Sequence, residues 1–494
     1  MKTFGGGLKM CRQKPFLLSL IGLFVFLGWF ESALAQNIVW TKTYGGIQDD
    51  AGYSIQECAD GGFIIAGTTY SFSMGGSDVY LIRIDVDGDT LWTKTYGGTG
   101  GDYAKSVEVC PDGGFIIAGS TNSFGAGGSD VYIIRTNSLG DTLWTKTCGG
   151  ANDDAGFSVQ RCLSGGFIIA GYTYSFGAGH WDVYLIRTDS LGDTLWTKTY
   201  GGIDYDVGFS VEECSDSGFI ITGMTYSFGA GDADIYLIRT DSWGNTIWTK
   251  TYGGTKYDAG YSVQECASGS FIITGRTLSF GIYWAHPYLL KTDAGGNLLW
   301  IKTYAGGGGD AGCSVKEASS GGFMIVGWAY STVNASEVYL ARTDANGDTL
   351  WTKYFGGGNY DAGYSLNRCA SGGFIIAGET KSFGAGGSDV YIIRLAETGI
   401  EEDLEASVSD GLIVYPNPTL GDVIIEYELP EEGEVTLRLY DAGGRLVRSL
   451  YPGKQNRGIH KIEMKKDGLN AGIYFIEFIS SIFKIRTEKL TILK

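Results

Sequence analysis

Apolar runs and polar turns alternate along most of this chain in one fixed order, which repeats five times at 52 residues and once at 51. In the first complete repeat the runs are Gly52–Cys58, Gly62–Thr69, Val79–Ile84 and Thr90–Gly97, and clusters of Gly, Asp and Ser separate them. Short runs bounded by such turn residues predict β-strands. The tryptophan that opens W-T-K-T-Y-G-G and its variants marks the period, at Trp40, Trp92, Trp144, Trp196, Trp248, Trp300 and Trp351.

The second and third runs of each repeat are almost continuously apolar, as in Phe63–Ala66 and Val79–Ile82. A strand buried on one face would alternate apolar and polar residues. These strands are therefore predicted to be buried on both faces, as in sheets that stack on other sheets. Four strands in a repeat of about 40–50 residues indicate the blade of a β-propeller.

The repeats begin and end out of phase. The repeat region opens on a lone fourth-strand run, Asn37–Gly46, and ends on a third-strand run, Val390–Leu395. If these two runs pair, seven complete blades result and the joint leaves no exposed strand edge. We therefore predict an all-β fold in which residues 36–398 form a seven-bladed β-propeller closed by its N-terminal strand. An open β-solenoid is the alternative.

A recurring pair of residues fixes the expected register of the third and fourth strands. Arg83 lies nine residues before Trp92, and the same spacing of a basic residue and tryptophan recurs in later repeats. In a hairpin the two residues would face each other, with the guanidinium over the indole ring. Arg394 has no tryptophan nine residues later, so Trp40 is expected to lie opposite Arg394.

Composition and charge exclude several partners. The chain of 494 residues has a formal net charge of −18, and it combines 79 glycines with only 7 prolines and 14% aromatic residues, which argues against a disordered chain. An acidic chain without a basic patch is repelled by nucleic acid and by anionic membranes. We therefore predict no nucleic-acid partner.

Residues 1–35 have the pattern of a secretory signal peptide. Four basic residues precede the apolar run Phe16–Phe30, and Ala33–Ala35 offers small residues for cleavage. A retained membrane anchor is the alternative, but the run is shorter than the ~20 residues that a spanning helix needs. The mature chain is expected outside the cytoplasm, without a transmembrane span.

Six cysteines share one position of the repeat, 18 residues after the framework tryptophan. Equivalent positions on facing sheets lie about 10 Å apart, whereas a disulfide needs Cα atoms within about 7 Å. We therefore expect buried free thiols that pack as small apolar residues, and no C-x-x-C pair indicates a metal site. The six residues are Cys58, Cys110, Cys162, Cys214, Cys266 and Cys369.

The repeat pattern stops near residue 398. The acidic stretch 399–411 has no apolar pattern and predicts a linker. From Leu412 onward the sequence pattern changes, and Val435, Leu437 and Leu439 alternate with polar neighbours. This alternation predicts a small antiparallel β-sandwich at residues 412–494.

This C-terminal segment resembles a known family. I-V-Y-P-N-P-T at Ile413–Thr419, L-Y-D-A-G-G-R at Leu439–Arg445 and G-L-N-A-G-I-Y-F at Gly468–Phe475 follow the order seen in the C-terminal sorting domain of type IX secretion substrates. The resemblance implies an Ig-like fold, interaction with that secretion machinery, and a secreted or outer-surface location in a Gram-negative, Bacteroidota-type bacterium. A related Ig-like module of hook-capping proteins shares parts of the pattern, and an accessory sandwich is the plain alternative.

The repeats themselves resemble a second family over one hairpin. T-D-S-L-G-D-T-L-W-T-K at Thr188–Lys198 is similar to the D-x-x-G-x-x-x-W hairpin of propeller repeats of the pyrroloquinoline-quinone type. The resemblance implies the fold and transfers no cofactor.

Carboxylates recur at two positions that a propeller would place on one rim. An aspartate stands ten residues after each framework tryptophan, and the loop between the second and third strands also ends in an acidic residue in most repeats. Two acidic rings could supply the oxygen ligands that Ca²⁺ takes, whereas the alternative is that each aspartate caps its own turn. Calcium is the only cofactor for which ligands are offered, at Asp50, Asp102, Asp154, Asp206, Asp258, Asp310 and Asp361.

Departures from the repeat are better pointers to a site than the repeat itself, because a scaffold recurs and a binding site usually occurs once. The third, fifth and sixth repeats place aromatic and polar residues where the others have small ones, and exposed aromatic loop residues suit ligand binding. Local packing of drifting loops is the alternative. The candidate residues are His180, Trp181, Tyr283, Trp284, His286, Trp328, Tyr330 and Asn334.

No catalytic motif stands out: the chain has no H-E-x-x-H, no G-x-S-x-G and no G-x-x-x-x-G-K phosphate loop. We expect an exported binding module for a glycan or protein ligand, centred on the fifth and sixth repeats. The alternative is a secreted polysaccharide-active or quinone-dependent enzyme, which would need a polar cluster at the centre of the ring. A purely structural surface protein is the third possibility.

Overall fold

The structure, a computed structural model, describes residues 38–281, 284–304, 309–318, 321–330, 335–396, 413–415, 419, 421–429, 432–441, 445–480 and 486–492. Every regular element in these ranges is a β-strand, so none of them holds a helix that could cross a membrane. The chain divides between residues 397 and 398 into two compact units, each taken here by itself. The predicted signal peptide, residues 1–35, and linker, residues 399–411, lie outside the described residues.

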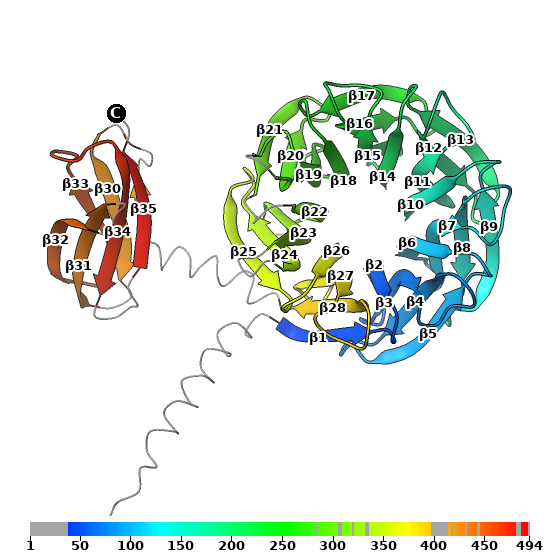
Figure 1. The fold of residues 1–494 in the computed structure, drawn as a ribbon, viewed down its shortest axis with the longest axis horizontal. Helices are drawn as coiled ribbons and strands as arrows, with labels where there is room; N and C mark the ends of the chain where they lie inside the picture. Colours follow the sequence, from blue (N-terminus) through cyan, green and yellow to red (C-terminus); the bar gives the residue numbers. More distant parts are fainter. Residues whose placement is uncertain are drawn as a thin grey trace, which may run out of the picture. The chain divides into compact units, whose positions relative to one another are not determined.

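The first unit consists of four-stranded antiparallel sheets, and its described part contains seven of them. Figure 1 shows the sheets side by side around a common centre, with the first strand of each innermost and the fourth outermost. Six sheets follow the chain in order. Their strands are β2 (Asp50–Glu57), β3 (Phe63–Thr69), β4 (Asp78–Ile84) and β5 (Thr90–Tyr96); β6 (Asp102–Val109), β7 (Phe115–Thr121), β8 (Asp130–Thr136) and β9 (Thr142–Cys148); β10 (Asp154–Arg161), β11 (Phe167–Thr173), β12 (Asp182–Thr188) and β13 (Thr194–Tyr200); β14 (Asp206–Glu213), β15 (Phe219–Thr225), β16 (Asp234–Thr240) and β17 (Thr246–Tyr252); β18 (Asp258–Glu265), β19 (Phe271–Thr277), β20 (His286–Thr292) and β21 (Leu298–Thr303); and β22 (Ala311–Glu317), β23 (Phe323–Tyr330), β24 (Ser336–Thr343) and β25 (Thr349–Phe355).

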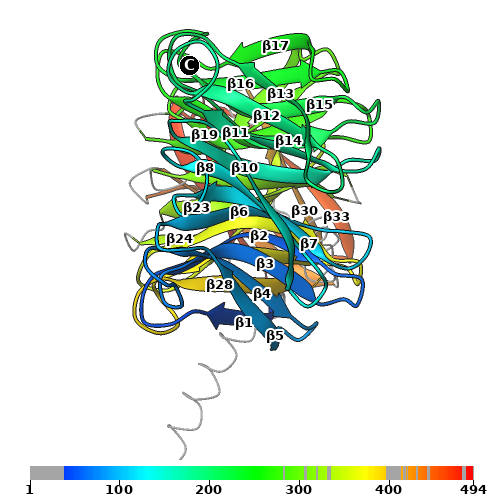
Figure 2. The same cartoon turned by 90° about the vertical axis from the view of Figure 1, so that its right-hand side faces the viewer.

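The seventh sheet joins the two ends of the repeat region. It contains β1 (Ile38–Tyr44), β28 (Asp389–Leu395), β27 (Phe374–Thr380) and β26 (Asp361–Arg368), in that order. β1 pairs antiparallel with β28 and its register sets Trp40 opposite Arg394, as the spacing of the sequence predicts. Figure 2 shows β1 beside β28 from a second direction.

Hydrogen bonds from β2 also join the first sheet to the seventh. The amide of Ile55 donates a hydrogen bond to Ser365 Oγ at 3.3 Å, and the amide of Asp50 donates to the carbonyl of Ser388 at 2.7 Å. The same kind of bond from a backbone amide to a serine hydroxyl links successive sheets elsewhere, for example from the amide of Val107 to Ser54 Oγ at 3.2 Å. Residues more than 300 positions apart are therefore bonded in the same way as residues of adjacent repeats.

The apolar cores of the first unit lie between neighbouring sheets. All seven positions of β3 and of β4 are buried, as their continuous apolar runs predict. Residues of one sheet, such as Ile64 and Val79, belong to one buried cluster with Phe115 and Tyr132 of the next. Each sheet thus needs a neighbour to cover its faces, and burial of apolar surface contributes about 25 cal/mol per Å².

The recurring W-T-K-T-Y motif of the outer strands binds the hairpin turn of the following sheet. From β1, Trp40 Nε1 donates to the carbonyl of Val86 at 3.1 Å, and Tyr44 Oη donates to the carbonyl of Gly88 at 2.6 Å. Lys42 Nζ lies 2.9 Å from a carboxylate oxygen of Asp89. Gly88 has a φ of +80°, and a Cβ there would lie 3.1 Å from the Trp40 ring, so the turn requires glycine.

The side chains of the Arg–Trp pair do not interact as the sequence predicts, although the backbone register is correct. The guanidinium of Arg83 donates to the carboxylate of Asp60 and to the carbonyl of Ile84. The indole of Trp92 instead packs against Phe115 of the next sheet, with ring centroids 6.0 Å apart. Carbonyl and carboxylate acceptors form charge-assisted hydrogen bonds with the guanidinium, and these are stronger than a contact with a ring face.

One position of the innermost strands carries polar residues in every repeat. The position holds carboxylates in the second and fourth repeats and a cation in the sixth. Burial raises the pKa of Glu108 to about 7 and that of Glu212 to about 7, and the charge of Lys316 partly offsets both shifts. The seven residues are Gln56, Glu108, Gln160, Glu212, Gln264, Lys316 and Asn367.

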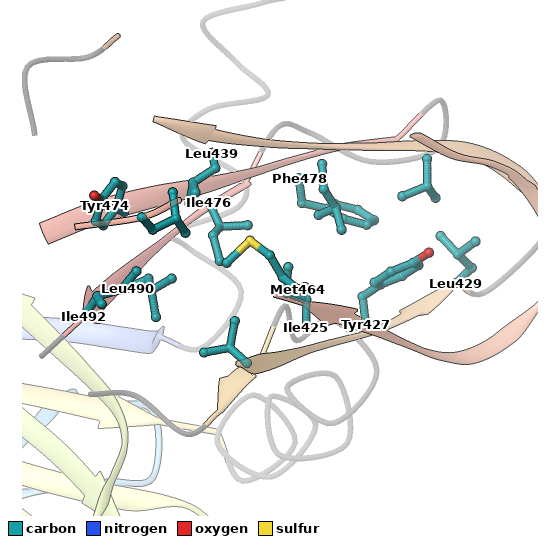
Figure 3. Close-up of a cluster of buried hydrophobic side chains, with 14 residues drawn as sticks. Ile425, Tyr427, Leu429, Leu439, Met464, Tyr474, Ile476, Phe478, Leu490 and Ile492 are labelled. Atoms are coloured by element: carbon teal, nitrogen blue, oxygen red, sulfur yellow. The ribbon is translucent and has the colours of Figure 1, made fainter. Parts of the chain in front are cut away.

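The second unit has two antiparallel sheets around its own core. One contains β29 (Ile413–Tyr415), β30 (Val423–Leu429) and β33 (Gly458–Met464), and the other contains β32 (Leu446–Gln455), β31 (Gly433–Asp441), β34 (Gly472–Ser480) and β35 (Arg486–Ile492). Side chains from both sheets fill the core, among them Ile425, Tyr427 and Met464 from one sheet and Leu439, Ile476 and Phe478 from the other (Figure 3).

The eight cysteines of the described residues are free thiols. Of the six at the repeated position, five are buried and Cys58 is half-buried, which confirms the predicted packing role except for the partial exposure of Cys58. Burial raises the pKa of Cys162, Cys214 and Cys369 to about 12.

These thiols should be unreactive in the folded protein. With a pKa of about 12, only about one thiol in ten thousand is ionised at pH 8, and the thiolate is the reactive form. We expect less than a tenth of the labelling rate of the urea-unfolded chain when iodoacetamide is applied at pH 8 and modified cysteines are counted by mass spectrometry. Rapid labelling of Cys162 or Cys214 in the native protein would contradict this packing.

Glu108 should make stability depend on pH. Its pKa is raised in the folded state, so the folded protein binds more protons than the unfolded chain between about pH 4.5 and 7, and stability is lost as pH rises through this window. Glu108→Gln should therefore stabilise the protein by about 1–2 kcal/mol at pH 8 and much less at pH 5. The reverse change at the equivalent position, Gln160→Glu, should have the opposite sign. Chemical denaturation at pH 5 and pH 8 measures the change in the free energy of unfolding, and equal changes at the two pH values would contradict this explanation.

Candidate functional site

The repeats differ most in the loops beside the inner strands. One variable position directly precedes the third strand, or begins it in the sixth repeat, and holds Ser77, Ser129, Trp181, Ala233, Ala285, Ser336 and Ser388. A second directly precedes the repeated aspartate at the start of the first strand and holds Asp49, Gly101, Asp153, Tyr205, Tyr257, Gly309 and Tyr360. Trp181 is the sole tryptophan at the first position. The structure brings Trp181 together with Tyr205, which follows it by 24 residues.

These residues line a hollow of about 520 Å³ between the loops of the third and fourth repeats. We call it the aromatic hollow, and define it by Trp181, Asp204, Tyr205, Met224, Tyr226 and Gly231. Trp181 comes from the loop before β12, Asp204 and Tyr205 from the crossing before β14, and the other three from β15 and the loop after it. Tyr205 and Tyr226 are each 39% exposed, so the rings are open to solvent.

The rings around the aromatic hollow pack on one another in a continuous cluster. Trp181 stacks on Tyr172 with centroids 4.5 Å apart, and His180 stacks on Tyr205 at 4.7 Å with an angle of 11° between the ring planes. Trp181 meets Tyr205 edge to face at 5.2 Å and 83°, and Tyr205 meets Tyr226 at 6.2 Å and 77°. Such contacts hold the side chains in fixed orientations.

Backbone hydrogen bonds fix the loops that carry these rings. The amide of Asp206 donates to the carbonyl of Trp181 at 2.6 Å, and the amide of Tyr226 donates to the carbonyl of Tyr205 at 2.9 Å. The amide of Asp204 donates to Ser227 Oγ at 3.1 Å, and that hydroxyl donates in turn to the carboxylate of Asp206 at 2.6 Å. The repeated aspartate thus anchors the loop on which the variable residues stand.

Acidic side chains surround the cluster. Burial raises the pKa of Tyr172, and the charges of Asp153 and Asp154 raise it further. Burial and the charge of Asp232 likewise raise the pKa of Tyr226. The phenols are therefore protonated at neutral pH and lie in a negative potential.

Among the described residues, no ring contact or hydrogen bond links the predicted site residues Trp284 and His286 to Trp328 and Tyr330. Trp284 is 65% exposed, and His286 is half-buried at the start of β20. Trp328 is half-buried, donates from Nε1 to the carbonyl of Gly309 at 3.2 Å and packs edge to face on Tyr364, while Tyr330 is 43% exposed. Tyr283 and Asn334 lie outside the described residues. The site residues predicted in the fifth and sixth repeats therefore stay predictions.

The seven repeated aspartates are buried in their own loops. Asp50 Oδ2 accepts hydrogen bonds from the amide of Gly46 at 2.8 Å and from Ser71 Oγ at 2.6 Å, and Asp102 is held in the same way by Gly98 and Ser123. These contacts match the turn-capping alternative. Among the described residues no group of three or more His, Cys, Asp or Glu side chains is placed to hold a metal ion. Calcium binding stays a prediction.

A second set of variable residues lies on the innermost strands. Tyr53 and Tyr364 pack with centroids 5.2 Å apart, and Phe209 packs on Phe157 and on Tyr261 at 5.4 and 5.3 Å. The position holds Tyr53, Lys105, Phe157, Phe209, Tyr261, Cys313 and Tyr364.

Lys105 is the charged member of this inner set. Its Nζ lies 3.7 Å from the centroid of the Tyr53 ring. Burial lowers the pKa of Lys105 to about 8, against the opposing effect of the Glu379 charge. Position-by-position comparison of the repeats would have identified this set and Tyr205, whereas the search for unusual aromatic and polar residues in the loops of the third, fifth and sixth repeats found neither.

Comparison with known proteins yields one match to a family. The profile described as "Secretion system C-terminal sorting domain" matches residues 413–492. A curated relative, "Regulatory protein FlaEY" of Caulobacter vibrioides, is 23% identical over 383 residues, which cover 71% of this chain and 36% of the relative. The chain therefore spans about a third of the length of that protein.

Solved structures with a similar course of the chain are distant. PorZ, a surface component of the type IX secretion system of Porphyromonas gingivalis, is 11% identical with a TM-score of 0.44, over 91% of this chain and 60% of that one. A protein of unknown function from Dyadobacter fermentans is 11% identical with a TM-score of 0.42, over 73% and 98% of the two chains. The β-propeller domain of the Trilobed protease from Pyrococcus furiosus is 8% identical with a TM-score of 0.40, over 71% and 94%.

The family match coincides with the segment whose motifs resemble type IX sorting domains, and its bounds coincide with the first and last strands of the second unit. Residues 413–492 are thus a C-terminal sorting domain of the type IX secretion route, and the chain is a secreted or cell-surface protein.

Proposed function

We propose that residues 36–398 are a seven-bladed β-propeller closed by its N-terminal strand, which a linker at residues 399–411 joins to an Ig-like β-sandwich at residues 412–494, after removal of a signal peptide at residues 1–35. The pairing of β1 with β28 supports closure, as does the Ile55–Ser365 hydrogen bond between the first and last sheets. The two-sheet core of the second unit supports a sandwich.

We further propose that this exported propeller is a binding protein, whose ligand, a glycan or a protein, docks at the aromatic hollow. The observation that carries this proposal is the coincidence of the hollow with positions at which otherwise near-identical repeats differ. The residues that recur in every repeat already provide the packing and the hydrogen bonds between sheets. A cluster of exposed rings that pack on one another is therefore not needed for the fold. Rigid aromatic side chains offer large contact area at a low entropic cost.

An enzymatic function has less support. Cleavage of a glycosidic bond ordinarily needs two carboxyl groups on opposite sides of the bond. The residues that line the aromatic hollow include a single carboxylate, Asp204. Lys105 of the inner set lies over the Tyr53 ring, and Glu379 of β27 accepts a hydrogen bond from Tyr364, so neither belongs to a recognised nucleophile–base motif. We therefore give binding precedence over catalysis.

Removal of the second unit should block export. In a bacterium that carries the type IX system, a variant without residues 412–494 should accumulate inside the cell envelope, whereas the full chain reaches the surface or the medium. Immunoblots of fractionated cells measure the distribution, and a reporter fused to residues 412–494 provides the matched control. Surface delivery of the truncated chain would contradict the sorting role.

Trp181→Ala and Tyr205→Ala should each weaken ligand binding at least tenfold, because each removes one wall of the aromatic hollow. Trp243→Ala and Trp284→Ala, which remove tryptophans that are 68% and 65% exposed elsewhere, should leave binding unchanged. Glycan and peptide arrays probed with the mature protein would identify a ligand for the comparison. Loss of binding in the Trp284 variant but not in the Trp181 variant would place the site in the fifth repeat and reject our assignment.

A further inference from the structure

The aromatic hollow combines ring walls with negative charge and no positive charge. Of its six lining residues three are aromatic, one is a thioether, one is glycine and one, Asp204, is a carboxylate. Met224 Sδ accepts a hydrogen bond from Tyr257 Oη at 3.3 Å, so the sulfur is held in place. A ligand in this hollow would meet aromatic rings and a carboxylate, but no cationic side chain of the lining.

Further carboxylates reinforce that charge. Asp232 acts electrostatically on Tyr226, and Asp153 acts on Tyr172, which stacks on Trp181. The whole chain carries a formal net charge of −18. These carboxylates disfavour phosphates, sulfates and carboxylated sugars at the hollow and favour cations. The charge of Arg276 acts on Tyr257, which is bonded to Met224.

The orientation of the rings favours a rounded ligand over a flat one. Trp181 and Tyr205 meet at 83° and Tyr205 and Tyr226 meet at 77°, so the walls of the hollow turn through near right angles. A single sugar ring stacks best on one flat platform, whereas a compact cation can face several rings at once. Ring faces carry partial negative charge and attract ammonium and guanidinium groups within about 6 Å.

We infer that the aromatic hollow recognises an alkylated ammonium group, held against Trp181, Tyr205 and Tyr226 and neutralised by Asp204. The inference rests on the proposed binding function and names the chemistry of its ligand. Such a group is found both in small choline-like molecules and in the lysine side chains of proteins. The two sources share the recognition chemistry and differ in what surrounds the cation.

Small probes test the charge directly. Choline should quench or shift the tryptophan fluorescence of the mature protein in a saturable way, whereas its neutral isostere, 3,3-dimethyl-1-butanol, should bind at least tenfold more weakly. The two compounds have nearly the same shape, so a difference reports charge and not apolar fit. Raising the salt concentration should weaken choline binding and leave the alcohol unaffected. Equal affinity for both compounds would overturn the inference.

Peptides distinguish the source of the cation. A lysine-rich peptide that binds more tightly than choline, and loses binding when its lysines are acetylated, would identify a protein partner, because acetylation removes the charge. Tighter binding of choline would identify a small molecule. Either result supports a cation site, whereas binding of neither probe would reject it.

Variants assign the effect to the hollow. Trp181→Ala and Tyr226→Ala should each weaken choline binding about tenfold or more, and Asp204→Asn, which keeps the size of the side chain, should weaken it severalfold. Trp243→Ala is the matched control, and circular dichroism verifies the fold of every variant. Unchanged choline binding in Trp181→Ala would overturn the inference. If neutral glycans bind at the hollow and lose binding in Trp181→Ala while choline does not bind, the proposed function stands and the cation inference fails.

Discussion

The fold depends on strands that are apolar on both faces. In β3 and β4 every position is buried, so each sheet must be covered by a neighbour on either side. A row of such sheets would leave an apolar face in water at each end unless a cap covered it, and pairing of the two ends into a ring, as we propose, would cover both. The pairing of β1 with β28 and the contacts of Ile55 with Ser365 are what this constraint demands. The clasp of Trp40, Lys42 and Tyr44 on the next hairpin adds directional bonds to the apolar contacts.

The same constraint separates framework from function. Residues that recur in each repeat serve packing, hydrogen bonding between sheets or turn formation. For example, Trp92 packs on Phe115, Gly88 leaves room for the Trp40 ring, and Asp206 anchors its loop through Gly202 and Ser227. Positions that vary between repeats do not have these structural roles. Trp181 and Tyr205 stand at two such positions on loops that the invariant Asp206 holds in place. In the proposed site, the framework thus holds the loops in place, and substitution at a few positions would supply the chemistry of binding.

The period of the sequence was enough to predict the strands and the register of the closing pair, because a repeat constrains every copy at once. It could not predict which acceptors the Arg83 guanidinium would choose, since Asp60 and the Ile84 carbonyl come within reach only in the folded turn. His180 and Trp181 were identified as candidates, but Tyr205 and Asp204 were not, because they belong to the next repeat and become neighbours only through the packing of loops. Trp328 stays a candidate; its ring packs on Tyr364 and its indole N–H donates to the carbonyl of Gly309, contacts that form only in the folded chain.

Hydrogen exchange of β1 tests the closed ring most directly. If Ile38–Tyr44 pairs with β28 in solution, its ladder amides should exchange as slowly as those of β5 and β9, the equivalent outer strands of the first two complete repeats. Mass spectrometry of peptides that span these strands would report the rates under native conditions. Exchange of the Ile38–Tyr44 amides at the rate of an unpaired segment, with β5 and β9 protected, would contradict closure and, with it, the shared framework from which the binding site is inferred.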